Sequence, residues 1–296
     1  MAGLSRPRTP LLAAPLFAIA LLSADALAQT SRRPTATEIR DAIAKLQSDN
    51  LDQVRDAIQF LGVSEAPTAV DPLVALLRTG PADIYTEAIV EALGSLARPT
   101  ALPALLDYLR HRRVNVRTKV IDAIASIRDP RVRPALEQGL RDSDSRVRGA
   151  AALALGRTGA TASLPVLFRA FERGVPEAAV AIGQLGSAQS SEELLAYLGR
   201  RPLPLVLPGF KEFLGRRDFP EAAKLVVVEK LLDLAGPQVK RFLIAYVASL
   251  PESDHSRVRQ AAEEAIRRIP DEASPRPPAR PVNPPAPAAT VQPGGN

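Results

Sequence analysis

The sequence contains no cysteine and no tryptophan, and aromatic residues make up only 4% of it. Without cysteine the chain cannot form disulfides, use a thiol nucleophile or bind a metal through thiolates. With so few aromatic side chains, alanine and leucine dominate the interior positions. These residues lead the helix-propensity ranking, and their small side chains suit closely packed helices. The composition therefore favours a helical protein.

Histidine is almost as scarce, since His111 and His255 are the two copies in the chain. A zinc site needs several converging ligands, and neither histidine has such neighbours in the sequence. Asp142 and Asp144 alternate as in a calcium loop, but the central glycine and distal glutamate of that motif are missing. No nucleophile elbow, phosphate-binding loop or dinucleotide fingerprint is present. We therefore predict no catalytic residue, cofactor or metal site, although side chains of different repeats could still converge on one surface.

A long hydrophobic run is also missing, because no segment reaches the roughly 18 apolar residues of a membrane-spanning helix. Residues 1–28 instead combine a basic start, a short apolar stretch and a small-x-small triplet, which is typical of a secretory signal peptide. We predict cleavage between Ala28 and Gln29, with an uncleaved N-terminal anchor as the alternative. Export without cysteine is compatible with a bacterial periplasm or the cell exterior.

The C-terminal residues 270–296 are rich in proline. Proline fixes its own φ and supplies no backbone donor, so we predict a disordered tail with polyproline character. The tail could act as a spacer, as a ligand for a groove-type partner, or merely as a solvated terminus. Residues 29–36 are predicted to be disordered as well. The folded body is expected to comprise residues 37–269.

A repeat is the strongest feature that the sequence does contain. Prolines stand at positions 72, 103, 134 and 165, spaced by 31 residues each time. A second series of small residues recurs at intervals of 29 to 32 residues: Gly62, Gly94, Ala125, Gly156, Gly186 and Gly215. A fixed period of this length indicates stacked copies of one small unit. Such an array grows along one axis and needs no single central core.

The clearest copy of the unit spans residues 140–171. Its residues 142–145 are suited to cap a first helix, in which apolar residues recur at spacings of three and four. Gly156 and Gly159 are expected to end that helix, and Pro165 is expected to lie in the first turn of a second helix. Each unit is thus predicted to be a helix, a tight turn and a helix. The same order is predicted for residues 53–77, 85–109 and 116–140.

This copy resembles a HEAT-like repeat of the short type, also called the phycocyanobilin-lyase HEAT-like repeat. The resemblance depends on the acidic turn, on Val147-Arg148, on Leu155-Gly156 and on Pro165. It covers about residues 37–269. It implies an all-α, HEAT/armadillo-like solenoid, a superhelical array of about seven antiparallel helix pairs.

The repeat pattern is less regular toward the ends of the predicted array. Pro208 lies in the sixth first helix, which we expect to start or bend at that residue. Further helices are predicted over residues 221–235, 238–250 and 256–269. The spacing of the anchors makes 238–250 a first helix and 256–269 the closing helix. Residue types alone would make 256–269 a first helix, and we favour the former interpretation. At the other end, a threonine-capped helix over 37–45 is expected to close the array.

The resemblance implies that the second helices line an inner, concave surface where a protein partner binds. Tyrosine and arginine are favoured as binding anchors, although the same residues could simply solvate the helices. The candidate partner-binding residues are Tyr108, Arg112, Arg169, Arg173, Glu193 and Tyr197. The leading hypothesis is therefore an exported, non-enzymatic scaffold for protein–protein interaction.

Two alternatives remain open. The formal net charge of +6 and the arginine-rich clusters at 110–113, 128–133, 141–148 and 216–217 could form a basic strip for an anionic polymer or nucleic acid. Predicted export argues against nucleic acid, and the charge could equally be a solvated surface. The resemblance also reaches proteins with accessory lyase activity, which would make the chain an enzyme. No residue identified in the sequence carries that activity.

Overall fold

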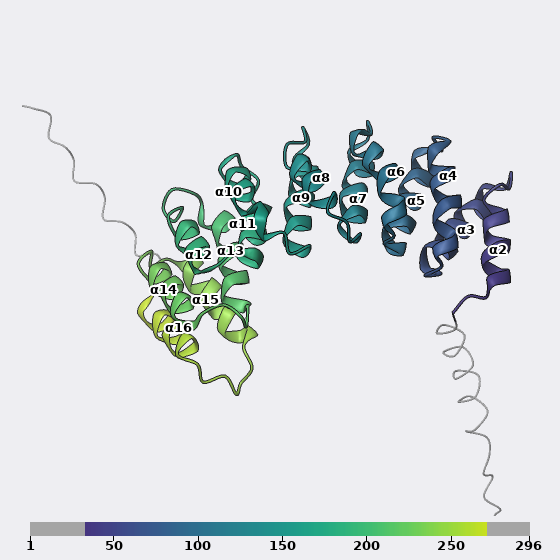
Figure 1. Cartoon of the computed structure of the whole chain (residues 1–296). Coiled ribbons are helices and arrows are strands. Elements are labelled where there is room, and N and C mark those ends of the chain that lie inside the picture. Colours follow the sequence, from purple (N-terminus) through teal and green to yellow (C-terminus); the bar gives the residue numbers. More distant parts are fainter. Residues whose placement is uncertain (1–32, 271–296) are drawn as a thin grey trace, which may run out of the picture. The chain divides into compact units, whose positions relative to one another are not determined.

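The computed structural model describes residues 33–270 of the chain (Figure 1). The predictions for the signal peptide, for the Ala28–Gln29 cleavage site and for the proline-rich tail fall on residues outside this range. Within it there are fifteen α-helices and no β-strand. The helices are α2 (Ala36–Lys45), α3 (Leu51–Val63), α4 (Val70–Arg78), α5 (Asp83–Leu96), α6 (Leu102–Asp107), α7 (Val114–Ala125), α8 (Val132–Gly139), α9 (Ser145–Arg157), α10 (Leu164–Glu172), α11 (Glu177–Leu185), α12 (Ala188–Leu195), α13 (Leu203–Gly215), α14 (Glu221–Leu232), α15 (Pro237–Ser249) and α16 (Arg257–Arg268).

These helices confirm the predicted α-solenoid. After α2, the described helices form seven successive pairs, from α3–α4 to α15–α16. The chain divides into two compact units, the first ending at Val147 and the second beginning at Arg148. In the first unit α3 packs against α5 and α5 against α7, while α4 contacts α6. In the second unit α11 packs against α13 and α13 against α15. Stacking of like helices buries a continuous apolar seam in each unit.

The seam consists of aliphatic side chains at the positions that the periodicity predicts. In the first unit, Ile58 and Leu61 of α3 and Leu93 of α5 are fully buried. Burial of one such side chain contributes about 1.5–3 kcal/mol. Phenylalanine is the main aromatic contribution in the second unit, where Phe210 and Phe213 of α13 are fully buried.

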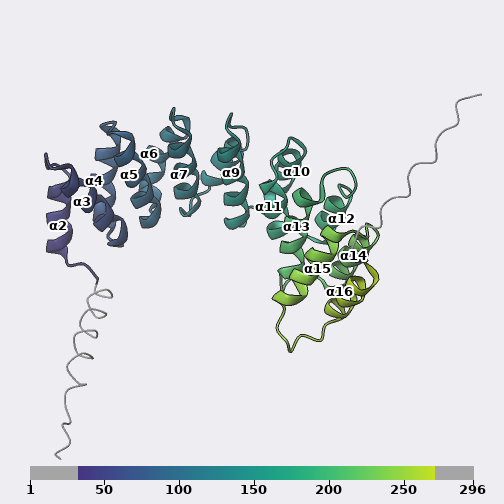
Figure 2. The same ribbon diagram turned by 180° about the vertical axis from the view of Figure 1, so that it is seen from behind.

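The contacts of the last helices decide which of them is the first helix of a pair and which is the second. α15 packs against α13, a first helix, whereas α16 packs against α14, a second helix. The pair α14 and α16 lies side by side in both views (Figure 2). The interpretation based on anchor spacing is therefore confirmed, and α15–α16 is the seventh pair.

The start of α2 differs slightly from the prediction. The helix begins at Ala36, and its cap is Thr35 rather than a residue within the predicted range 37–45. The Glu38 backbone N–H donates to the Thr35 hydroxyl at 3.3 Å, and the Thr35 backbone N–H donates to the Glu38 carboxylate at 2.6 Å. This reciprocal capping box satisfies two donors at once.

Helix α13 corrects the expectation for Pro208. The helix begins at Leu203 and continues through Pro208 to Gly215, so a start at Pro208 is wrong. Pro204 lies in the first turn, where a missing N–H is not needed. Burial of Val206 and Phe210 on either side of Pro208 offsets the backbone bond that this proline removes.

The glycine series also needs correction. Gly62, Gly94 and Gly156 lie inside helices α3, α5 and α9, so they do not end them. Of the two glycines predicted to end the first helix of the clearest copy, Gly159 rather than Gly156 has the left-handed backbone, with φ +70°. A Cβ on Gly94 would lie 2.8 Å from the Cα of Ala123, and one on Gly62 would lie 2.8 Å from the Cβ of Ala92. These glycines therefore mark the close approach of successive first helices.

Candidate interaction surfaces

A buried ion pair joins two loops between successive repeats of the first unit. The Arg117 side chain, 10% exposed, donates two hydrogen bonds of 2.8 Å to the Asp142 carboxylate. A third nitrogen of the same guanidinium donates to the carbonyl of His111 at 2.8 Å. Asp142 also accepts the backbone N–H of Asp144 at 2.9 Å. Asp142, which the sequence indicated only as a helix cap, thus connects the loop before α7 to the loop before α9 through Arg117.

The protonation of Asp142 follows from these contacts. Burial alone would raise the pKa of this carboxyl group, but the hydrogen bonds from Arg117 and from the Asp144 backbone outweigh it and hold the pKa below its ordinary 3.8. The same pairing raises the pKa of Arg117. Both groups are therefore charged at neutral pH.

Lowering the pH should weaken this pair. Because the folded-state pKa of Asp142 is depressed, its contribution to stability is present above the unfolded-state value of 3.8 and is lost as pH falls through the lower folded-state value. We expect the stability loss between pH 7 and about pH 3 to be smaller in Arg117→Met than in the wild type. Urea unfolding at both pH values measures this difference. Equal losses in the two proteins would contradict the assignment.

Two of the sequence-predicted binding residues, Tyr108 and Arg112, lie beside the same loop. The Tyr108 hydroxyl donates to the carbonyl of Leu77 at 2.5 Å, and its ring stacks on His111 with centroids 5.7 Å apart. Burial raises the pKa of Tyr108, with a smaller contribution from a nearby carboxylate. The Arg112 side chain is 81% exposed and lies 3.6 Å from the Asp83 carboxylate. Tyr108 therefore holds two repeats together, whereas Arg112 is accessible to a partner.

The Asp83 carboxylate lies among the basic side chains of this loop. Its carboxylate lies 3.7 Å from Nε2 of His111 and also contacts the guanidinium of Arg113. The Nδ1 atom of His111 accepts the backbone N–H of Arg113 at 3.2 Å. Both ring nitrogens of His111, which the sequence gave no ligand role, thus face groups of the same chain.

The other four predicted residues lie in the second unit. The Tyr197 hydroxyl donates to the Glu172 carboxylate at 2.9 Å, and its ring meets the edge of Phe171 at 5.2 Å. Burial, followed by the hydrogen bond to Glu172, raises the pKa of Tyr197 to about 12. The remaining three side chains are exposed and make no hydrogen bond or ion pair among residues 33–270. They are Arg169, Arg173 and Glu193.

The basic clusters do not form one strip within the first unit. Residues 110–113 precede the N-terminus of α7, whereas residues 128–133 follow its C-terminus. A helix of 12 residues separates these ends by about 18 Å. Arg131 pairs with Asp129 at 2.8 Å, and Arg133 pairs with Glu137 at 2.8 Å. These two clusters thus lie at opposite ends of α7, while residues 141–148 lie before and at the start of α9.

Three grooves run along the outer side of the first helices in the first unit, and we call them the first-helix grooves. They lie between α2 and α3, between α3 and α5, and between α5 and α7, with volumes of about 430, 240 and 490 Å³. Small residues line each groove: Ala42 and Ala57 the first, Ala88 and Ala92 the second, Gly94 and Ala123 the third. The second and third grooves share Glu91 and Ser95. The grooves therefore form a row.

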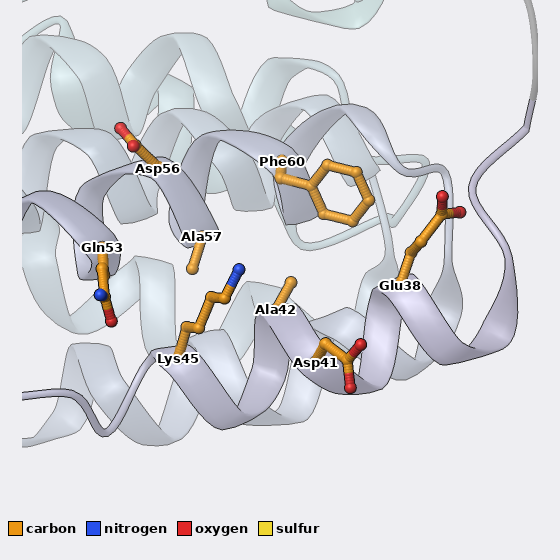
Figure 3. Close-up of a pocket in the computed structure, with 8 residues that line it drawn as sticks. All are labelled: Glu38, Asp41, Ala42, Lys45, Gln53, Asp56, Ala57 and Phe60. Carbon is orange, nitrogen blue, oxygen red and sulfur yellow. The ribbon is translucent and has the colours of Figure 1, made fainter.

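The first groove shows how its charges and apolar surface are arranged (Figure 3). Lys45 extends from α2 into the space beside Ala57, and the ring of Phe60 lies on the α3 side of the groove. Glu38 and Asp41 stand along the α2 side. An apolar floor bordered by charges is suited to bind part of a peptide chain.

Exposed apolar side chains border the second groove. Val63 is 74% exposed and Ile84 is 69% exposed, and both line the groove between α3 and α5. Leu51, 62% exposed, begins α3, and its carbonyl accepts the Tyr85 hydroxyl at 3.3 Å. Gly62 approaches Ala92 and Tyr85 contacts Leu51, so Val63 borders one end of this groove and Ile84 borders the other. Exposed apolar side chains along one groove are candidates for an interaction site. The sequence analysis missed these residues, although their positions outside the buried stripe could have indicated them.

Two other kinds of site are absent from the part of the chain that the structure describes. Residues 33–270 hold no cluster of three or more His, Asp or Glu side chains that could bind a metal ion. In the same range, no helix has the length and apolar character to cross a membrane.

Comparison with known proteins agrees with the fold. Residues 85–156 and 102–177 match the family model described as HEAT repeats. The HEAT-like resemblance seen in the sequence is thereby confirmed for α5 to the start of α11. No curated protein matches the chain.

Several solved structures are similar to this chain over most of its length. The complex of CpcE and CpcF of phycocyanin lyase from Nostoc sp. PCC7120 is 21% identical, with 81% of this chain and 97% of that chain covered and a TM-score of 0.45. Human deoxyhypusine hydroxylase in complex with glycerol is 20% identical, with 78% and 96% covered and a TM-score of 0.38. An engineered protein is 18% identical, with 78% and 96% covered and a TM-score of 0.36.

Proposed function

We propose that this chain is an exported, non-enzymatic scaffold that binds another protein through its helical repeats. The observation that carries the proposal is the second first-helix groove, where Val63 and Ile84 remain largely exposed beside a floor of small residues. Exposed apolar side chains of this size gain free energy when a partner covers them. Export is supported by the signal-peptide pattern of residues 1–28.

The grooves favour the first helices of the first unit as the binding surface. The sequence analysis placed the partner on the second helices, and Arg169, Arg173 and Glu193 remain candidates for a further contact in the second unit. Their guanidinium and carboxylate groups are exposed and would need no intramolecular bond to be broken on binding.

Binding of an anionic polymer is less well supported. Two of the arginine clusters lie at opposite ends of α7, and Arg113, Arg131 and Arg133 contact carboxylates. A polymer would have to compete with these carboxylates, and its binding would fall steeply with salt. A lyase-like activity would need several side chains that converge on one bound substrate. We assign no residues to such a role.

The proposal is tested by capture of partners from the native envelope. We expect the double variant Val63→Asp/Ile84→Asp to retain about one tenth or less of the proteins captured by the wild type, because each carboxylate would be desolvated at the contact. The matched control is Leu234→Asp/Ile244→Asp, which changes two side chains of the second unit that are 38% and 47% exposed. Capture that is equal in the wild type and the Val63/Ile84 variant would overturn the proposed surface.

A further inference from the structure

The proline-rich tail has a spacing that matches the first-helix grooves. Within residues 275–287, a proline occurs at every third position: Pro275, Pro278, Pro281, Pro284 and Pro287. A polyproline II helix has three residues per turn and rises about 3.1 Å per residue. A peptide with this spacing in that conformation would therefore place its prolines along one edge, about 9.3 Å apart.

The first-helix grooves repeat at a similar distance. Packed helices lie about 8–10 Å apart, and the contacts of Gly62 with Ala92 and of Gly94 with Ala123 bring α3, α5 and α7 close together. Successive grooves should therefore be separated by about one turn of polyproline II helix. A peptide crossing the helices could place one proline ring in each groove, against the small residues of its floor.

Charge favours the same arrangement. Residues 275–287 contain Arg276 and Arg280 and no acidic residue. The first-helix grooves carry more acidic than basic side chains, although the whole chain has a formal net charge of +6. The acidic ones are Glu38, Asp41, Asp56, Glu91 and Asp122, and the basic ones are Lys45, Arg55 and Lys119. The electrostatic term is thus attractive for this segment.

We propose that residues 275–287 bind across the three first-helix grooves of a second copy of the chain, one in-register proline to a groove. The proposal rests on the proposed function, because it assigns an occupant to the surface described there. It gives the tail a regulatory role, since a partner for these grooves would have to displace it.

Site-specific crosslinking in the full-length chain tests this proposal. The chain contains no cysteine, so Ala286→Cys provides a single position for a benzophenone label. On illumination, we expect crosslinks to peptides from α2, α3, α5 and α7, mapped by mass spectrometry. A dimer-sized product, which shows binding between two copies, supports the proposal, whereas groove crosslinks found in a monomer-sized product alone would contradict it. Crosslinks confined to other helices, or to none, would overturn it.

Two matched triple variants test the register. Replacing Pro278, Pro281 and Pro284 by alanine should lower the groove crosslinks by about fivefold or more, because the proline edge is lost. Replacing Pro270, Pro277 and Pro285 by alanine removes as many prolines outside the register, and the yield should change by less than about twofold. Equal losses in both variants would contradict the one-proline-per-groove arrangement.

The groove side is tested with the Val63→Asp/Ile84→Asp variant, which should lower the crosslinks to α3 and α5, whereas Leu234→Asp/Ile244→Asp should leave them unchanged. If partner capture depends on Val63 and Ile84 but the tail does not crosslink there, the tail proposal is wrong and the proposed function stands. If the tail crosslinks there but capture is unaffected, the proposed function is wrong instead.

Discussion

Replacing Arg117 with methionine is expected to lower the free energy of unfolding by about 3–5 kcal/mol. The guanidinium is buried, and it donates two 2.8 Å hydrogen bonds to Asp142 and one to the carbonyl of His111. Methionine fills a similar volume but leaves a half-buried carboxylate and a loop carbonyl without their donor. The loss is therefore one of uncompensated polar groups rather than of packing. Urea unfolding followed by circular dichroism measures it.

Two further variants separate the ion pair from general charge effects. Arg131→Met removes a pair with Asp129 whose arginine side chain is 56% exposed, so we expect a much smaller change in the urea midpoint than for Arg117→Met. Arg117→Met/Asp142→Asn removes both charges and should recover part of the stability lost in the single variant. A loss below about 1 kcal/mol for Arg117→Met would show that the pair contributes no more than a surface contact.

Replacing Gly94 with alanine should destabilise the first unit by about 1–3 kcal/mol, although alanine is the better helix former by about 1 kcal/mol. The added Cβ would lie 2.8 Å from the Cα of Ala123, so α5 and α7 would have to move apart. That movement reduces the contact of the buried apolar side chains along both helices. The midpoint of urea unfolding reports the change.

Gly215 provides the matched control for Gly94. It is also a helical glycine near a C-terminus, but a Cβ added there would meet nothing within 4 Å. Gly215→Ala should therefore leave stability unchanged or raise it by up to about 1 kcal/mol. If the two substitutions had the same effect, close approach of the first helices would not be the reason for glycine at position 94.

The repeat and its helices could be predicted because they depend on local spacing. Apolar periodicity, capping residues and first-turn prolines act within one turn or one helix, so a single copy of the unit predicts the others. The assignment of α15 as a first helix and of α16 as a second helix followed from the same spacing. The boundary residues were less accurate, as at Thr35 and Pro208, because burial and reciprocal capping act beyond the local propensity.

The roles of the glycines and of Asp142 could not be predicted in this way. A glycine near a helix end has the same sequence context whether it ends the helix or accommodates a neighbour, so Gly94 was assigned the wrong role. Asp142 caps its own loop as predicted, but its partner Arg117 lies 25 residues earlier, and nothing local connects the two. Tyr108 and Tyr197 were chosen as binding anchors, yet both hydroxyls are used inside the fold.

The sequence by itself determined that this protein is a stack of helix pairs, because a period of 31 residues repeats the same helix signals along the chain. Only the tertiary structure decided which surfaces are open, because exposure depends on which helix packs against which. It showed that the glycines bring first helices together and that grooves follow those contacts. It also left Val63 and Ile84 uncovered.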